Sequence, residues 1–143
     1  MATEERKAMS RQAIGMWAGG AEIDASIFTA DYTNHQEPAA DGGVRTIELS
    51  TWISIVEANH RAFADLSVHI LKQLADGDQV ATHWRFSATQ TGAYEGREAT
   101  GKPVAWTGVQ IDRFADGRIA ESWVVWDKYS MFEQLDLISV AMR

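Results

Sequence analysis

Residues 104–126 read VAWTGVQIDRFADGRIAESWVVW, two alternating runs with a short polar break between them. Apolar and polar residues alternate on both sides of Ala115-Asp116-Gly117, which is typical of two strands with one buried face. We expect strands over 104–114 and 118–126, joined by a three-residue turn with Gly117 left-handed and Phe114 paired with Arg118. This pairing places the even-numbered residues on one shared face: Trp106, Gly108, Gln110, Asp112, Ala120, Ser122, Val124 and Trp126.

The rest of the chain puts its helices first and its strands after them. Three-to-four-residue spacing of apolar side chains predicts helices over 4–17 and 47–63, with a short helix over 23–28. Period-two alternation predicts strands over 67–74 and 80–91, and a last helix follows the hairpin at 127–137. Such segregation favours an α+β fold with helices packed on a curved antiparallel sheet. Without an internal repeat or linker, residues 1–143 are expected to form one domain.

Composition excludes several classes of function. The chain of 143 residues carries 13 Lys+Arg against 20 Asp+Glu, a net charge of −7, and no cysteine. An acidic chain has no basic stripe for nucleic-acid phosphates, and without thiols there are no disulfides or thiolate metal sites. The N-terminus is charged, and no apolar run approaches the ~20 residues of a membrane span. We therefore expect a cytoplasmic protein with no nucleic-acid or membrane partner.

Short motifs occur along nearly the whole chain in one order. They are 31–35 (DYTNH), 62–66 (AFADL), 77–80 (GDQV), 88–92 (ATQTG), 100–102 (TGK), 113–119 (RFADGRI), 126–127 (WD) and 134–135 (QL). In this order they resemble the SnoaL-like polyketide cyclases, within the wider fold of nuclear transport factor 2 and ketosteroid isomerase. The resemblance implies a cone-shaped α+β barrel, in which a curved antiparallel sheet wraps an apolar cavity, and a homodimer formed through the outer sheet face.

The resemblance also implies a chemistry that this chain alters. The family's cyclases use an Asp as acid and base, with a companion His and no cofactor, and these two positions fall on Val124 and Gln110 here. A related branch is associated with hydroxylation of anthracycline-type polyketides. The implied function is an enzyme acting on an aromatic polyketide-type molecule, as hydroxylase or cyclase. A hydrolase or dehydratase of the same fold and a non-catalytic binder of hydrophobic ligands stay open as alternatives.

Two residues are candidates for catalysis, and each has a structural alternative. His35 precedes a loop that could cover the mouth of a cone, where an imidazole acts as base near neutral pH or is simply solvated. Asp127 opens the last helix, where it is either an acid–base group or an N-cap. His83 either lines the cavity or lies on the dimer surface. Asp112, close to the turn, is expected to be solvated.

Aromatic and amide side chains are candidates for substrate binding. Trp106 and Trp126 either clamp a flat ligand or pack in the core, and Gln110 between them is a polar anchor or an ordinary strand residue. No metal-ligand spacing and no glycine-rich phosphate loop is present, so neither a metal nor a nucleotide cofactor is expected. The predicted substrate-binding set is Asn34, Trp52, Phe63, Gln90, Trp106, Gln110, Val124 and Trp126.

Overall fold

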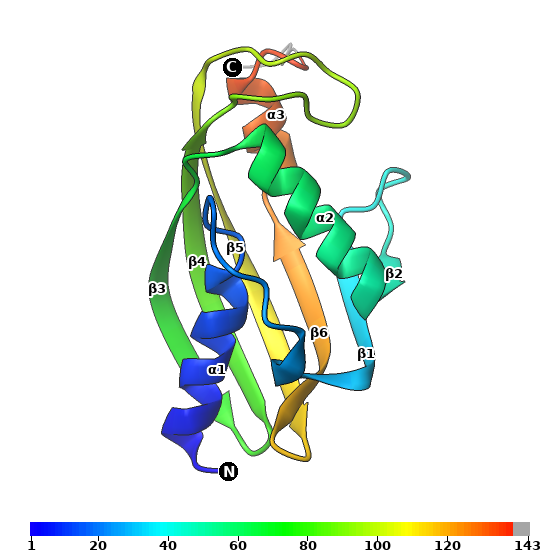
Figure 1. Ribbon diagram of the computed structural model, residues 1–143, viewed down its shortest axis with the longest axis vertical. Helices are drawn as coiled ribbons and strands as arrows, with labels where there is room; N and C mark the ends of the chain where they lie inside the picture. Colours follow the sequence, from blue (N-terminus) through cyan, green and yellow to red (C-terminus); the bar gives the residue numbers. More distant parts are fainter. Residues whose placement is uncertain (139–143) are drawn as a thin grey trace.

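The computed structural model describes residues 1–138, which form helices packed against one six-stranded sheet (Figure 1). This arrangement confirms the predicted α+β class. In chain order the elements are α1 (Thr3–Gly15), the 3-10 turn η1 (Ala25–Ile27), β1 (Phe28–Glu37), β2 (Arg45–Glu48), α2 (Leu49–Ala62), β3 (Ser67–Asp76), β4 (Gln79–Thr89), β5 (Pro103–Ala115), β6 (Arg118–Trp126) and α3 (Lys128–Gln134).

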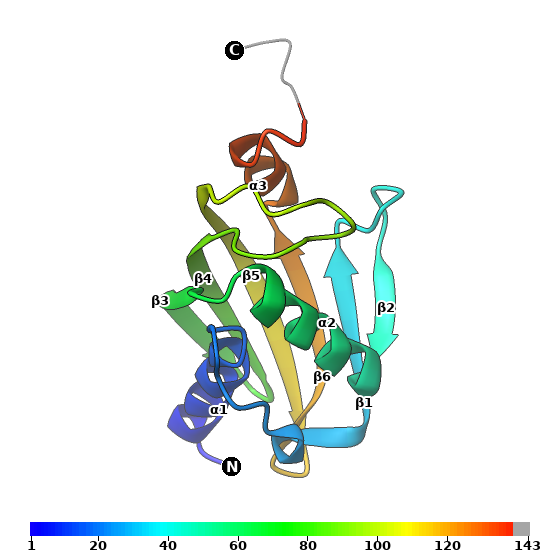
Figure 2. The same ribbon diagram turned by 45° about the horizontal axis from the view of Figure 1, so that its top comes forward.

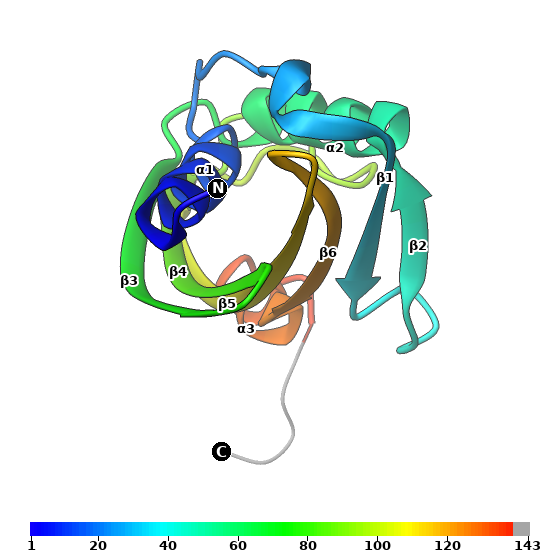
Figure 3. The same ribbon diagram turned by 90° about the horizontal axis from the view of Figure 1, so that it is seen from below.

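The sheet is curved and does not close on itself (Figures 2 and 3). Its strand order is β2-β1-β6-β5-β4-β3. Strands β3 to β6 pair as an antiparallel meander, whereas β1 pairs parallel with β6, so the sheet is mixed rather than wholly antiparallel as expected. Helix α1 lies against β3 and β4, and α2 lies against β1 and β2. Seen from below, both helices lie across the concave side of the sheet (Figure 3).

The β5–β6 hairpin differs from prediction at its turn but not in its faces. Ala115 pairs with Arg118, so the turn has two residues, Asp116 and Gly117, with φ of 53° and 74°. A two-residue turn with both residues left-handed has a backbone twist that matches the right-handed twist of the strands, so the shorter turn is favoured. A bulge between the Arg113 and Phe114 pairs then shifts the register by one residue. The even-numbered residues of both strands therefore still share one face.

The region before α2 contains strands where helices were expected. Only Ala25–Ile27 is helical within the predicted 23–28 helix, because the Asp24 carboxylate accepts the Ser26 N–H and β1 begins at once. The predicted 47–63 helix begins later, since β2 occupies residues Arg45–Glu48. Strand β1 is stabilised by its distant partner β6 on one side, and β2 pairs with β1 on the other. Tertiary pairing here overrides local helical pattern.

Two clusters of buried side chains fill the concave side. One lies toward α3 and contains Phe63, Phe86, Trp106 and Leu135. The other lies toward the β5–β6 turn and contains Phe28, Trp52, Phe114 and Ile119. The rigidity of these clusters fixes the strands and helices that surround the candidate site.

Candidate functional site

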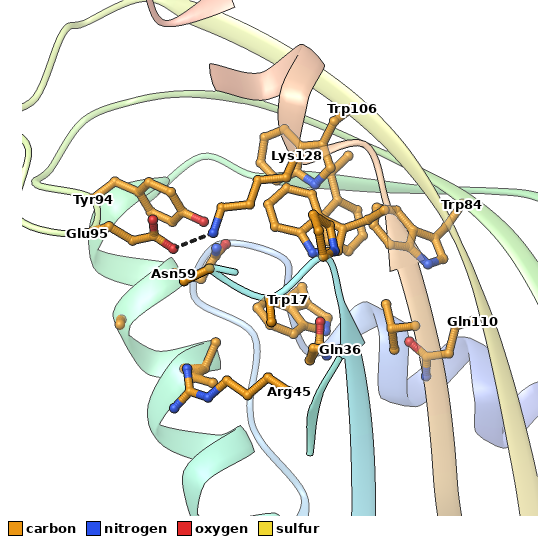
Figure 4. A pocket seen from close by; sticks show the side chains of 18 of the residues that line it. Trp17, Gln36, Arg45, Asn59, Trp84, Tyr94, Glu95, Trp106, Gln110 and Lys128 are labelled. Carbon is orange, nitrogen blue, oxygen red and sulfur yellow. Dashed lines mark hydrogen bonds and ion pairs between the residues drawn. The ribbon is translucent and has the colours of Figure 1, made fainter. Parts of the chain in front are cut away.

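A cavity of about 490 Å³ opens on the concave side, between α2, the sheet and two loops (Figure 4). Its size falls within the range of small-molecule sites, roughly 300–1,000 Å³. Helix α2 supplies one wall, strands β1, β4, β5 and β6 supply the floor, and residues 38–40 and 93–95 flank it. The lining residues are Trp17, Gln36, Pro38, Ala39, Ala40, Arg45, Ile55, Ala58, Asn59, Trp84, Phe86, Ala93, Tyr94, Glu95, Trp106, Gln110, Val124, Trp126 and Lys128.

Four tryptophans, Trp17, Trp84, Trp106 and Trp126, contribute to the apolar part of this lining. Trp106 and Trp126 lie with ring centroids 6.0 Å apart, and Trp84 stacks on Phe86 at 4.1 Å. Gly108 makes the Trp84 position possible, because a Cβ there would lie 2.3 Å from Trp84 Cζ2. Flat indole rings offer large apolar faces with little conformational freedom to lose. The cavity thus offers aromatic faces against which a flat ring can stack.

Two glutamines flank a valine on the cavity floor. Gln36 on β1 pairs with Val124 on β6, and Val124 pairs with Gln110 on β5. The three residues therefore form one row across adjacent strands, and all three line the cavity. These three residues are polar at both ends and apolar in the centre, and Arg45 on β2 pairs with Gln36 and continues the row at its β1 end.

A buried hydrogen-bond network connects the two glutamines underneath the floor. Gln36 Nε2 donates to Asn34 Oδ1 at 2.7 Å, and Asn34 Nδ2 donates to the Tyr32 hydroxyl at 2.8 Å. Tyr32 donates to Ser122 Oγ at 2.8 Å, and Ser122 donates to Asp112 Oδ1 at 2.6 Å. Gln110 Nε2 also donates to Asp112 Oδ1, at 2.8 Å. We call Tyr32, Asn34, Asp112 and Ser122 the buried network.

Asp112 is fully buried, which corrects the expectation that it is solvated. It pairs with Ser122 on β6 and Val80 on β4, and its side chain lies on the face of the sheet that α1 covers, where Ser10 is a neighbour. Burial raises the pKa of Asp112, while the side chains of Ser122, Gln110 and Ser10 act in the opposite direction. Among the described residues, the Oδ2 atom of Asp112 and the buried hydroxyl of Ser10 both lack a hydrogen bond of normal geometry. Asp112 does not line the cavity, and Gln110 lies between the two.

One ion pair lies elsewhere on the lining, away from the glutamine row. Lys128 Nζ bonds to Glu95 Oε1 at 3.1 Å, and Figure 4 shows this pair beside Tyr94. Burial raises the pKa of the Tyr94 phenol, which therefore stays protonated at neutral pH. Arg45 on β2 lies apart from this ion pair, because it pairs with Gln36 across the β1–β2 ladder, and Figure 4 shows it beside Gln36.

Half of the predicted substrate-binding set lines the cavity: Trp106, Gln110, Val124 and Trp126. The other members support the cavity from outside its lining. Asn34 is part of the buried network, and Trp52 packs against Phe28 in the cluster toward the β5–β6 turn. Phe63 packs against Trp106 with ring centroids 5.4 Å apart.

Gln90 fixes the loop that carries Tyr94. Its Oε1 accepts from the N–H of Thr100 at 3.2 Å and from its hydroxyl at 2.7 Å. Its Nε2 donates to the carbonyls of Gly92 and Glu98. Gln90 is fully buried and ties both ends of the 92–100 loop together.

The two predicted catalytic residues are not part of the cavity lining. His35 Nε2 lies 2.7 Å from Glu121 Oε2, and its ring stacks on Trp123 on the outer face of the sheet. Asp127 accepts the Ser130 N–H at 2.9 Å and is the N-cap of α3. A catalytic role for either stays a prediction, and their contacts are those of structural residues. His83 lies on the outer face, where it lines a shallow hollow with Lys72 and Val109.

Sequence reasoning missed several lining residues, above all Gln36, Trp17 and Trp84. Trp84 lies on the predicted alternating strand over 80–91, on the same face as Phe86. Assigning that face of the strand to the cavity would have identified it. Gln36 was placed at the start of a loop, because nothing local indicates that β1 continues to Glu37 beside β6.

The described part of the chain holds no group of three or more His, Asp or Glu side chains placed to bind a metal ion. Within residues 1–138, no helix has both the length and the apolar character needed to cross a bilayer.

The sequence matches the family model described as SnoaL-like polyketide cyclase over residues 10–135. The fold is similar to that of AclR, a proposed hydroxylase from Streptomyces galilaeus, with a TM-score of 0.81 and 24% identity, over 96% of this chain and 100% of that one. It is also similar to a proposed SnoaL-like polyketide cyclase from Jannaschia sp. CCS1, with a TM-score of 0.79 and 16% identity, over 95% and 94% of the two chains.

A further similar structure is IdmH, a proposed polyketide cyclase from Streptomyces antibioticus, with a TM-score of 0.73 and 24% identity, over 93% of this chain and 97% of that one. At these identities the likenesses establish the fold. The curated proteins include no match to this sequence.

Proposed function

Because the chain belongs to the family of SnoaL-like polyketide cyclases, we propose that it is an enzyme acting on a flat aromatic molecule of polyketide type. The observation that carries this proposal is the tryptophan-lined cavity with its row of Gln36, Val124 and Gln110. A planar ring system would stack against the tryptophans, and the glutamines would orient its polar groups.

The floor favours a hydroxylase-like reaction over the aldol cyclisation implied by the family's Asp and His. Val124 cannot exchange a proton, and a neutral amide at Gln110 cannot act as a base near neutral pH. In hydroxylation the oxidant would supply the reactivity, and the chain's part would be to stack, orient and desolvate the ring. Hydroxylation needs dioxygen and electrons from an external donor, which the assay therefore supplies.

The test is to incubate the protein with anthraquinone-type polyketide esters in air, with and without a general reductase, and to weigh the products. A mass gain of one oxygen, dependent on the protein and the reductase, is the expected result. A product of unchanged mass would indicate cyclisation or isomerisation and would contradict the hydroxylase-like reaction.

A non-catalytic binder is the second candidate, and one observation favours it. The one carboxyl next to the glutamine row, Asp112, is fully buried and separated from the cavity by Gln110. A binder would show tryptophan fluorescence quenching by the same esters without any product in either assay.

We also propose a homodimer formed through the outer face of the sheet. This face exposes apolar side chains on neighbouring strands β5 and β6, which a monomer leaves in water. Sedimentation should show a dimer, and Trp123→Lys should convert it to a monomer; a wild-type monomer would contradict the proposal. The exposed side chains on this face are Val109, Ile111, Trp123 and Val125.

A further inference from the structure

We infer that Gln36 and Gln110 both present carbonyl oxygens to the cavity, and that the ligand they select is a fused aromatic with a hydroxyl group on each of two separate rings. This inference rests on the proposed function, because it specifies the polar groups of the flat ligand that the cavity would hold.

The direction of the hydrogen bonds begins at Asp112. An ionised carboxylate only accepts, so Ser122 and Gln110 must both donate to its Oδ1 atom. The same holds when a proton resides on Oδ2, because Oδ1 still accepts. Gln110 therefore turns its NH2 group toward Asp112 and its carbonyl oxygen away from it.

The same direction passes along the network to the second glutamine. Ser122 has one proton, which it gives to Asp112, so it must accept from the Tyr32 hydroxyl. Tyr32 in turn accepts, and the group it faces on Asn34 must be the NH2.

Asn34 then offers its oxygen to Gln36, whose NH2 donates to it. Each amide orientation follows from the previous bond, so one buried carboxyl sets both glutamines. A ligand in the cavity therefore faces a glutamine carbonyl oxygen at both ends of the row.

Neither glutamine oxygen is used within the protein. Among the described residues, no donor reaches Oε1 of Gln36 or Gln110. Neither atom is fully buried, so both remain accessible. Both oxygens are therefore open to the cavity, and in Figure 4 each points toward the space beneath the tryptophans. An open amide oxygen in an apolar cavity is satisfied by a ligand group that donates, such as a phenol or enol.

The separation of the two strands that carry the glutamines sets the approximate spacing of the hydroxyls. Gln36 and Gln110 lie on β1 and β5, with Val124 of β6 between them. Two strand separations place their Cα atoms roughly 10 Å apart. Neighbouring hydroxyls on one ring do not span this distance, whereas hydroxyls on the outer rings of a fused system do.

The probes are anthraflavic acid, a dihydroxyanthraquinone with one hydroxyl on each outer ring, and its dimethyl ether, which can accept but not donate. Their affinities are measured by quenching of tryptophan fluorescence, at a pH that keeps the phenols protonated. Each hydrogen bond gained is worth about 3- to 10-fold in affinity, so the dihydroxy compound should bind about 10-fold or more tightly.

Variants then separate the network from the fold. Gln110→Leu removes one acceptor and should reduce the preference for the hydroxyl compound about 3- to 10-fold. Ser122→Ala, outside the cavity, frees Tyr32, Asn34 and Gln36 to reverse, and should also reduce the preference. The control Thr82→Val removes a buried hydroxyl that accepts only from Gln73, and should leave the preference unchanged.

The outcomes distinguish the two proposals. Equal affinity for the two compounds, or a preference that survives both Gln110→Leu and Ser122→Ala, would overturn the inference about hydroxyl donors and leave the flat-ligand cavity standing. Binding of the dimethyl ether shows in each variant that the cavity is folded. If neither compound quenches fluorescence, the flat-ligand function itself fails, and the inference fails with it.

Discussion

At the scale of single residues, Gly108 is the position on which the aromatic wall depends. A side chain there would meet the Trp84 ring at 2.3 Å and the Trp126 Cβ at 2.9 Å. We expect Gly108→Ala to lower the free energy of unfolding by about 1–3 kcal/mol, because the indole must leave its packed position. Urea denaturation measures this change, and ligand affinity should fall with it.

The matched control for this substitution is Gly15→Ala in α1. No atom outside its own surroundings lies within 4 Å of the added Cβ, so only helix propensity changes. Stability should stay equal or rise by up to about 1 kcal/mol. Equal effects on stability at Gly108 and Gly15 would show that the packing of Trp84 does not depend on the absence of a side chain at position 108.

Asp112 makes a prediction about pH and stability. Because burial raises the pKa of Asp112 above 3.8, the folded chain binds this proton more tightly than the unfolded chain. The free energy of unfolding contributed by this group then falls as pH rises from about 3.8 through the raised pKa. Asn does not titrate there, so wild type should lose stability relative to Asp112→Asn over that window in urea denaturation.

Asp65 provides the comparison of opposite sign. The Thr89 N–H bonded to its carboxylate lowers the pKa of Asp65, so its stabilising contribution is complete above 3.8 and is lost as pH falls through the lowered value. Wild type should therefore gain stability relative to Asp65→Asn as pH rises. Curves of the same sign for both variants would contradict the burial of a carboxyl at Asp112.

Sequence reasoning at this scale found the residues whose strand carries a clear alternation. Period two put Trp106, Gln110, Val124 and Trp126 on one face, and the family resemblance implied that this face lines the cavity. It also put Asp112 on the correct face but misjudged its depth. Depth depends on what packs on that face of the sheet, here α1, which the alternation within one strand does not reveal.

At the scale of elements, the loop over 92–100 depends on Gln90. We expect Gln90→Leu to cost about 1–3 kcal/mol of stability, because the Thr100 N–H and two carbonyls lose a buried partner. Hydrogen exchange of amides in this loop should accelerate, and ligand affinity should weaken through Tyr94 and Glu95. The exposed Gln79→Leu is the control and should change neither. Unchanged exchange in Gln90→Leu would show that other contacts hold the loop.

The turn of the β5–β6 hairpin shows what local chemistry can and cannot decide. The Asp-Gly pair indicates a two-residue turn. Placing the even-numbered residues of both strands on one face required a three-residue turn in a regular hairpin. The structure satisfies both by adding a bulge beside Phe114. A bulge depends on how the whole strand fits its neighbour, so the alternation predicted the faces but not the pairing.

At the scale of the whole molecule, the order of helices and strands predicted the α+β class, and the spaced motifs predicted the family. The parallel pairing of β1 with β6 was not predictable in the same way. These strands are far apart in the sequence, and β1 lacks a clear alternation of buried and exposed residues. The missing strand explains the missing site residue, because Gln36 reaches the cavity only through this pairing.

The central claim is that the concave cavity binds a flat aromatic ligand, and adjacent valines on β6 test it directly. Val124 lies on the cavity floor, whereas Val125 is 54% exposed on the opposite face. The measurement is titration of an anthraquinone-type ester, by tryptophan fluorescence, into wild type, Val124→Phe and Val125→Phe, with folding checked by thermal denaturation. The account predicts binding that Val124→Phe weakens by about 10-fold or more through filling the cavity, and that Val125→Phe leaves intact. Undiminished binding in a folded Val124→Phe protein would contradict it.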